Sequence, residues 1–319
     1  MPGSTSPHTR AVSRKRLWTA AQVAFVGAVF WFAGRALAGQ WAGVAERLRG
    51  LQPAWGLVWV SAALVLAAYA ILIQTWRAML GAWGARLRFG EAARIWFVSN
   101  LGKYVPGKVW QLAAMVVMAQ GRGVSPVAAT GSTLVVNFAN VVSGFAVVFA
   151  TGATVLSLSA RAGPAAGAAI ALMLAAGLLA LPAAMPVLAR WAGRITGRSL
   201  AAPRIPPRSV WVATGGTAVA WVLYGVAFHL FAAALLHVPT GATTAYIATY
   251  TGSYLIGYLT LLAPGGIGVR EAMLVAGLTN LGLLTAPEAW LVAIASRLWL
   301  TALEVSPGLL FLLIPGERP

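Results

Sequence analysis

Charged side chains inside long apolar stretches are the residues of this sequence best suited to chemistry. They are Lys103, Lys108, Arg270, Glu271, Arg297 and Glu304. In a bilayer core each such charge costs roughly 2.5–3.5 kcal/mol on insertion scales, so each must pair, face the protein interior or contact a charged ligand. The four cations outnumber the two acids, and this positive surplus suits a phosphate group. A glycine-rich helix start nearby would add backbone N–H donors for the same phosphate.

The composition places these charges in a membrane protein. Of the 319 residues, 60% are hydrophobic and 9% are charged, whereas a soluble domain carries about 25% charged residues. The cations behind the net charge of +17 lie between apolar blocks, which favours contact with anionic lipids over binding to nucleic acid. The chain has no cysteine, and no histidine pair has the spacing of metal ligands. We therefore expect neither a metal nor a cofactor.

Apolar stretches long enough to cross about 30 Å of hydrocarbon recur along the chain. Six of them are predicted to be full spans: 17–37, 55–80, 127–156, 165–188, 210–236 and 289–314. Two more, 91–123 and 246–284, are broken by proline and glycine. The expected fold is an all-α polytopic membrane protein with six to eight transmembrane helices, depending on whether the broken stretches are re-entrant hairpins or full crossings.

Cations are distributed unevenly between the two predicted membrane surfaces. Fourteen lie on one side: Arg10, Arg14, Lys15, Arg16, Arg86, Arg88, Arg94, Arg122, Arg190, Arg194, Arg198, Arg204, Arg208 and Arg318. The other side receives Arg47, Arg49 and Arg161. The positive-inside rule then predicts that both termini are cytoplasmic, in a bacterial cytoplasmic membrane. Residues 1–16 are expected to be a disordered cytoplasmic tail, 17–314 a single transmembrane domain and 315–319 a second tail.

The two broken stretches resemble each other when Pro106 is laid on Pro264. PGKVWQLAAM then faces PGGIGVREAM, with four identities in ten positions. Three predicted spans separate the copies, so the hairpins should enter from opposite membrane faces as an inverted repeat. The predicted halves are 55–156, with hairpin 91–123, and 210–314, with hairpin 246–284. Interrupted helices at matching places in two halves indicate a transporter's binding site, because non-helical backbone must be buried or line a wet cavity.

The predicted headgroup site combines the residues around both breaks with the charges of the last span. Its members are Lys103, Pro106, Gly107, Lys108, Gln111, Gly265, Gly266, Arg270, Glu271, Arg297 and Glu304. Arg297 and Glu304 lie seven residues apart and so share one helix face, two turns apart. Asn137, Asn140 and His229 are expected to hydrogen-bond neighbouring helices, and the two asparagines could also line the cavity.

Two motifs carry a family resemblance. SNLGKYVPGKVWQ (99–111) and APGGIGVREAML (263–274) resemble the transmembrane domain of the lysylphosphatidylglycerol synthase family, also described as flippase-like, and SRLWLTALE (296–304) is similar to it too. The family's first motif reads Pro-x-Arg-x-Gly-Glu, where this chain has Lys108, Trp110 and Gln111. The second follows the pattern Pro-Gly-Gly-x-Gly-x-Arg-Glu closely. The resemblance implies lipid translocation or another role in envelope assembly, and aminoacylation is not expected of this chain.

Three functions are compatible with these features. The first is translocation of a lipid with an anionic, phosphate-bearing headgroup, with Lys108 and Arg270 on the phosphate. The second is an integral-membrane transferase, which is disfavoured because the chain has no aspartate and its glutamates are scattered, whereas such chemistry usually needs a carboxylate base or a metal-binding acid pair. The third is a non-catalytic partner of a neighbouring lipid- or glycan-modifying enzyme. The expected partners are membrane lipids, and we do not expect an enzyme.

Overall fold

The computed structural model describes residues 51–104, 109–158, 176, 206–260 and 266–313. Every regular element named in these ranges is a helix, which confirms the predicted all-α class. In chain order they are α2 (Trp55–Ala82), α3 (Phe89–Asn100), η1 (Leu101–Tyr104), α4 (Val109–Gln120), α5 (Pro126–Leu158), α7 (Pro207–Leu236), η2 (Thr240–Ala242), α8 (Thr243–Leu259), α9 (Val269–Asn280) and α10 (Ala286–Leu313).

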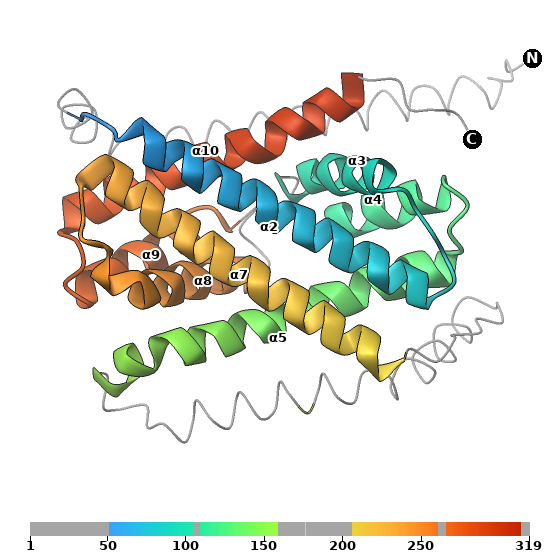
Figure 1. The fold of residues 1–319 in the computed structure, drawn as a ribbon, viewed down its shortest axis with the longest axis horizontal. Helices are drawn as coiled ribbons and strands as arrows, with labels where there is room; N and C mark the ends of the chain where they lie inside the picture. The colour runs from blue at the N-terminus through green and yellow to red at the C-terminus, as the bar shows by residue number, and fades with distance from the viewer. Residues whose placement is uncertain (1–50, 105–108, 159–175, 177–205, 261–265, 314–319) are drawn as a thin grey trace, which may run out of the picture.

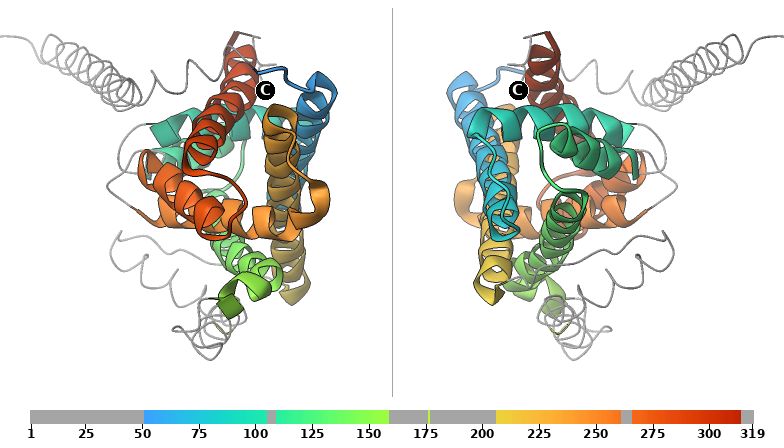
Figure 2. Two further views of the ribbon diagram at one scale, coloured as in Figure 1. Left: turned by 90° about the vertical axis from the view of Figure 1, so that its left-hand side faces the viewer. Right: turned by 90° about the vertical axis from the view of Figure 1, so that its right-hand side faces the viewer.

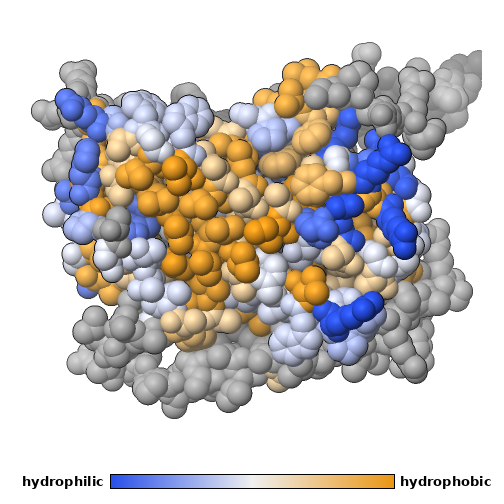
Figure 3. Space-filling view, in the orientation of Figure 1, coloured by the Kyte–Doolittle hydropathy of each residue, from blue (hydrophilic) through white to orange (hydrophobic). Residues whose placement is uncertain are grey.

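Four of the described helices, α2, α5, α7 and α10, are long and apolar enough to cross a membrane. Each coincides with a predicted span to within a few residues. Large apolar side chains on their outer faces remain exposed, among them Trp55, Trp59 and Trp211, and Figure 3 shows an apolar band between more hydrophilic ends. The predicted span 17–37, all of the predicted span 165–188 except residue 176, and both predicted tails lie outside the described residues.

Both broken stretches form hairpins of short helices. α3, α4 and α9 have 12 residues each and α8 has 17, so at 1.5 Å per residue a 12-residue arm is about 18 Å long. That length falls well short of the ~30 Å hydrocarbon core. In Figure 1 the α3–α4 hairpin enters from one end of the bundle and the α8–α9 hairpin from the other. The two hairpins thus enter the bundle from opposite ends, as an inverted arrangement predicts, and their re-entrant position in a membrane stays a prediction.

The long helices form a frame around the hairpins. α2 and α7 pack along each other, and the Ala54 N–H donates to the Ala234 carbonyl at 2.9 Å where α2 begins and α7 ends. Seen end-on, α2 and α7 occupy one side of the bundle, while α4 and α9 lie on the opposite side between α10 and α5 (Figure 2). The helices of both hairpins therefore pack among the long helices.

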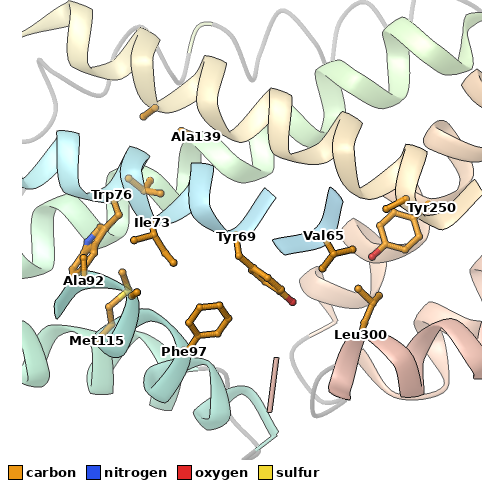
Figure 4. Packing of buried hydrophobic residues seen from close by; sticks show 14 of the residues in the cluster. Val65, Tyr69, Ile73, Trp76, Ala92, Phe97, Met115, Ala139, Tyr250 and Leu300 are labelled. Carbon is orange, nitrogen blue, oxygen red and sulfur yellow. The ribbon is translucent and has the colours of Figure 1, made fainter. Parts of the chain in front are cut away.

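Side chains from different helices fill the interior of this frame. Tyr69 on α2 meets Phe97 on α3 edge to face, with ring centroids 5.4 Å apart, and Trp76 is fully buried. Figure 4 shows Tyr69 pointing inward from α2, between Phe97 and Val65. Close packing of this kind fixes the depth at which each hairpin tip sits.

A glutamate at the third helical position caps the N-terminus of α3, α9 and α10. The Glu91, Glu271 and Glu288 carboxylates accept hydrogen bonds from the backbone N–H groups of Arg88, Gly268 and Thr285, at 3.0, 2.7 and 2.9 Å. Each bond satisfies a donor that the helix itself leaves unpaired. Half of the chain's six acidic residues are used in this way, and two of the three also form ion pairs.

Candidate functional site

A cavity lies where the two hairpin tips meet the middle of the long helices. Its volume is about 140 Å³, whereas a single water molecule needs roughly 10–15 Å³. Its lining comes from both hairpins and all four long helices: Tyr69, Leu72, Trp96, Asn100, Lys103, Gln111, Leu112, Met115, Val136, Asn137, Asn140, Trp221, Tyr224, Tyr250, Tyr254, Gly257, Tyr258, Arg270, Arg297, Leu300, Thr301 and Glu304. The structure thus brings together Lys103, Gln111, Arg270, Arg297 and Glu304 from the predicted site.

The first hairpin is tied to α10 by an ion pair. The Lys103 ammonium at its tip contacts the Glu304 carboxylate, and the two side chains are 19% and 10% exposed. Glu304 is thus paired with a residue 201 positions away. A pair this well buried is costly to break, because a lone charge would remain behind.

The second hairpin is tied to α10 by a second ion pair. Arg297 donates to the Glu271 Oε1 atom, while Glu271 Oε2 accepts the Gly268 N–H at 2.7 Å. Arg297 and Glu304 do share a face of α10, but each bonds a different hairpin. One backbone N–H at the glycine-rich start of α9, that of Gly268, is thus satisfied by Glu271.

Arg270 differs from the other cations of the cavity. Its side chain is 8% exposed, and among the described residues no carboxylate forms an ion pair with it. The guanidinium lies 5.3 Å from the ring centroid of Tyr250 and 4.8 Å from that of Tyr254, and it donates to the Tyr250 hydroxyl at 3.4 Å. These aromatic faces compensate part of the cost of burying the charge, and the charge remains available to an anion in the cavity.

Glycines allow the two arms of each hairpin to approach closely. A Cβ on Gly257 would lie 2.9 Å from the Arg270 Cβ, and a Cβ on Gly266, where φ is +70°, would lie 2.9 Å from the Gly257 carbonyl oxygen. In the first hairpin, a Cβ on Gly102 would lie 3.1 Å from the Gln111 backbone nitrogen. Glycine at Gly257 therefore sets the position of the Arg270 backbone against α8.

Neutral amides and tyrosines complete the polar lining. The Gln111 carboxamide donates to Asn100 within the first hairpin. The Tyr258 hydroxyl donates to the Asn137 Oδ1 atom at 3.2 Å, which joins the second hairpin to α5. Gln111 therefore has a partner although it stands where the family motif has an acid.

The tyrosines are the part of the site that the sequence reading missed. Tyr69, Tyr224, Tyr250, Tyr254 and Tyr258 all line the cavity. The last three recur every fourth residue, so they lie on one face of α8. A repeat of tyrosine at that spacing, inside an apolar stretch that ends at a break, was the available signal.

The remaining predicted residues are of two kinds, those that the structure does not describe and those that it places outside the lining. Pro106, Gly107, Lys108 and Gly265 fall outside the described residues, so their predicted contacts with a headgroup stay predictions. Gly266 and Glu271 belong to the second tip but are not part of the lining. His229 is buried, and its ring nitrogens are 3.0 Å from the Thr243 hydroxyl and 3.2 Å from the Pro239 carbonyl, which confirms the expected hydrogen bonds to neighbouring elements.

Comparison with known proteins agrees with the architecture. A search of curated proteins found no match. The family model of the lysylphosphatidylglycerol synthase TM region, however, matches residues 19–308, which include both hairpins, α2, α5, α7, most of α10 and all of the cavity lining. The motifs around both breaks fall within this match. The chain belongs to the lysylphosphatidylglycerol synthase transmembrane-region family.

Proposed function

We propose that this protein translocates a lipid with an anionic, phosphate-bearing headgroup across the bacterial cytoplasmic membrane. The observation that carries the proposal is Arg270, a buried cation that lines a cavity between two opposed re-entrant hairpins and lacks a carboxylate partner among the described residues. A phosphate would supply the missing negative charge. The lipid tails would stay in the bilayer, beside the exposed apolar faces of the long helices.

The acidic residues support transport over a chemical reaction. Glu304 is paired with Lys103, and Glu271 is paired with Arg297 and also caps α9. A general base must be within reach of the proton that it removes and free to accept it. Carboxylates held in buried ion pairs suit the positioning of hairpins better than proton transfer, so we propose that the protein is not an enzyme.

The two hairpins suggest how access would alternate. Each is anchored at its own end of the bundle, and each tip is bonded to α10. Movement of one hairpin-bearing half against the other would open the cavity first to one surface and then to the other. We also propose that the end where α3 begins faces the cytoplasm, because Arg86, Arg88, Arg94, Arg122 and Arg208 lie near it.

Transport in vesicles tests the proposal. Purified protein is reconstituted with a fluorescent anionic phospholipid, and transfer between leaflets is followed by chemical quenching of the outer leaflet. We expect the rate to fall about tenfold or more in Arg270→Gln, because the phosphate loses its cation. Arg86→Gln is the matched control, since that arginine is exposed and lies outside the cavity lining. Transfer by Arg270→Gln at the rate of the unmodified protein would remove Arg270 from the mechanism.

A further inference from the structure

Three aromatic and amide side chains form one wall of the cavity. Asn140 on α5, Trp221 on α7 and Tyr254 on α8 all line it. The Trp221 indole N–H donates to the Asn140 backbone carbonyl oxygen at 2.8 Å, and the Trp221 and Tyr254 rings meet edge to face with their centroids 5.3 Å apart. Trp221 therefore joins α5, α7 and α8 at this wall.

This wall lies directly beside the proposed phosphate-binding cation. The Arg270 guanidinium carbon is 4.8 Å from the centre of the Tyr254 ring. A group attached to a phosphate on Arg270 would therefore reach Tyr254 and the residues joined to it. The wall therefore lies where it would contact a substituent of the phosphate in a lipid headgroup.

The polar atoms of this wall match hydroxyl groups. Among the described residues, neither the Asn140 carboxamide nor the Tyr254 hydroxyl makes a hydrogen bond, and both residues are half-buried. An amide and a phenol can each donate and accept, as an alcohol does. A ring with an apolar face and a polar tip also suits a molecule that alternates C–H and O–H groups.

A cationic substituent fits the same wall poorly. The acid in the described lining, Glu304, is already paired with Lys103, and the nearby Glu271 is paired with Arg297. The faces of Tyr250 and Tyr254, which could hold an ammonium group, are occupied by Arg270. An ammonium group placed here would also face the charge of Arg270.

We propose that Asn140, Trp221 and Tyr254 form a subsite for an uncharged, hydroxyl-bearing substituent, a polyol or sugar, linked through a phosphodiester to the lipid. The inference rests on the proposed function, because it places the phosphate on Arg270. Asn140 and Tyr254 bind the hydroxyl groups, and Trp221 bonds the Asn140 backbone and packs against the Tyr254 ring. The subsite selects against aminoacylated, positively charged headgroups.

Lipid binding to the purified protein tests the subsite, by competition against a fluorescent phosphatidylglycerol. Phosphatidylglycerol and phosphatidylmethanol carry the same single negative charge, but only the former has headgroup hydroxyls. We expect phosphatidylglycerol to bind about 3- to 10-fold more tightly, and Tyr254→Phe and Asn140→Leu each to shrink this ratio. Tyr246→Phe, on the same helix but outside the cavity lining, is the control and should keep it.

Each further outcome is decisive. A ratio near one in the unmodified protein, an unchanged ratio in both variants, or tighter binding of lysyl-phosphatidylglycerol than of phosphatidylglycerol would overturn the subsite. Equal affinity for soluble glycerophosphoglycerol would assign the subsite to a soluble phosphodiester instead of a lipid. Arg270→Gln separates the two proposals. Weaker binding of both lipids with the ratio kept supports both, whereas unchanged binding of both would sink the proposed function itself.

Discussion

The two re-entrant hairpins have the same plan but opposite polarity where they meet α10. The first hairpin presents a cation, Lys103, to an acid of α10, and the second presents an acid, Glu271, to a cation of α10. The third residue of the second arm is Gln111 in one hairpin and Glu271 in the other. A single helix thus complements both tips, because Arg297 and Glu304 lie on the same face.

The same local chemistry also appears at different depths in the two hairpins. Glu91 caps α3 and pairs with Arg122 where the first hairpin begins and ends, whereas Glu271 caps α9 and pairs with Arg297 at the tip of the second. An ion pair therefore joins the two arms of the first hairpin at its base, whereas the capping glutamate of the second hairpin pairs with α10. The comparison teaches that the cavity receives neutral amides from one hairpin and its unmatched cation, Arg270, from the other.

The largest expected effect comes from breaking the charged contact at each tip. Glu304→Gln should lower the free energy of unfolding by about 3–5 kcal/mol, because it leaves Lys103 buried without its partner. Glu271→Gln should cost about 1 kcal/mol more, because its carboxylate also caps α9. Denaturant titration in detergent micelles measures both changes, and equal losses would contradict the difference between the tips.

The next effect concerns the close approach of the hairpin arms. Gly257→Ala should destabilise the protein by about 1–3 kcal/mol, because the new methyl group meets the Arg270 Cβ at 2.9 Å. Gly102→Ala should cost less, since its nearest contact is 3.1 Å. Gly90→Ala, with nothing within 4 Å, is the control and should be neutral or slightly stabilising. Thermal unfolding ranks the three variants, and a larger loss for Gly102→Ala would reverse the comparison.

Making the first hairpin acidic like the second should have a smaller effect. Gln111→Glu would place a new carboxylate in the lining, across the cavity from Arg270. We expect binding of an anionic phospholipid to weaken about tenfold, a loss of roughly 1.4 kcal/mol. Gln111→Met has a similar volume and no charge, and it should retain most of the affinity. Stronger binding of the anionic phospholipid by Gln111→Glu would contradict this. It would show that the acid of the family motif favours lipid binding more than the excess of cations in the cavity does.

The last comparison should leave transport unchanged. Gln120 and Asn280 end the second arms of the two hairpins, and both side chains are exposed. Because the chain has no cysteine, Gln120→Cys and Asn280→Cys each introduce a single labelling site. A membrane-impermeant maleimide should label Asn280→Cys in intact cells and Gln120→Cys only after the membrane is opened. Labelling of both from the outside would place the two hairpins on one surface.

Sequence periodicity and length predicted most of the fold. Apolar runs located the four described long helices, because a bilayer demands about 20 consecutive apolar residues. The proline and glycine breaks identified both hairpins, since unsatisfied backbone at that depth has few structural solutions. The odd number of predicted spans between the two hairpins then predicted that they enter from opposite membrane faces. That prediction required no knowledge of packing.

The internal arrangement of the site was less predictable. The charges at 103, 270, 297 and 304 do meet, as their positions near the breaks suggested. Their pairing could not be derived, because the partners Lys103 and Glu304 are separated by 201 positions and are joined only by packing. The five tyrosines of the cavity lining were missed for a different reason. A tyrosine in an apolar stretch is compatible equally with core packing and with a polar lining.

One feature of α10 has a mechanical consequence. Arg297 and Glu304 are two turns apart on the helix, about 10 Å along its axis, and Pro307, which lies inside the helix, follows both. The intervening helical segment is rigid and carries one ion pair to each hairpin. A tilt of α10 that lengthens one ion pair shortens the other. Under the proposed cycle this coupling disfavours a state in which the cavity is open to both compartments at once.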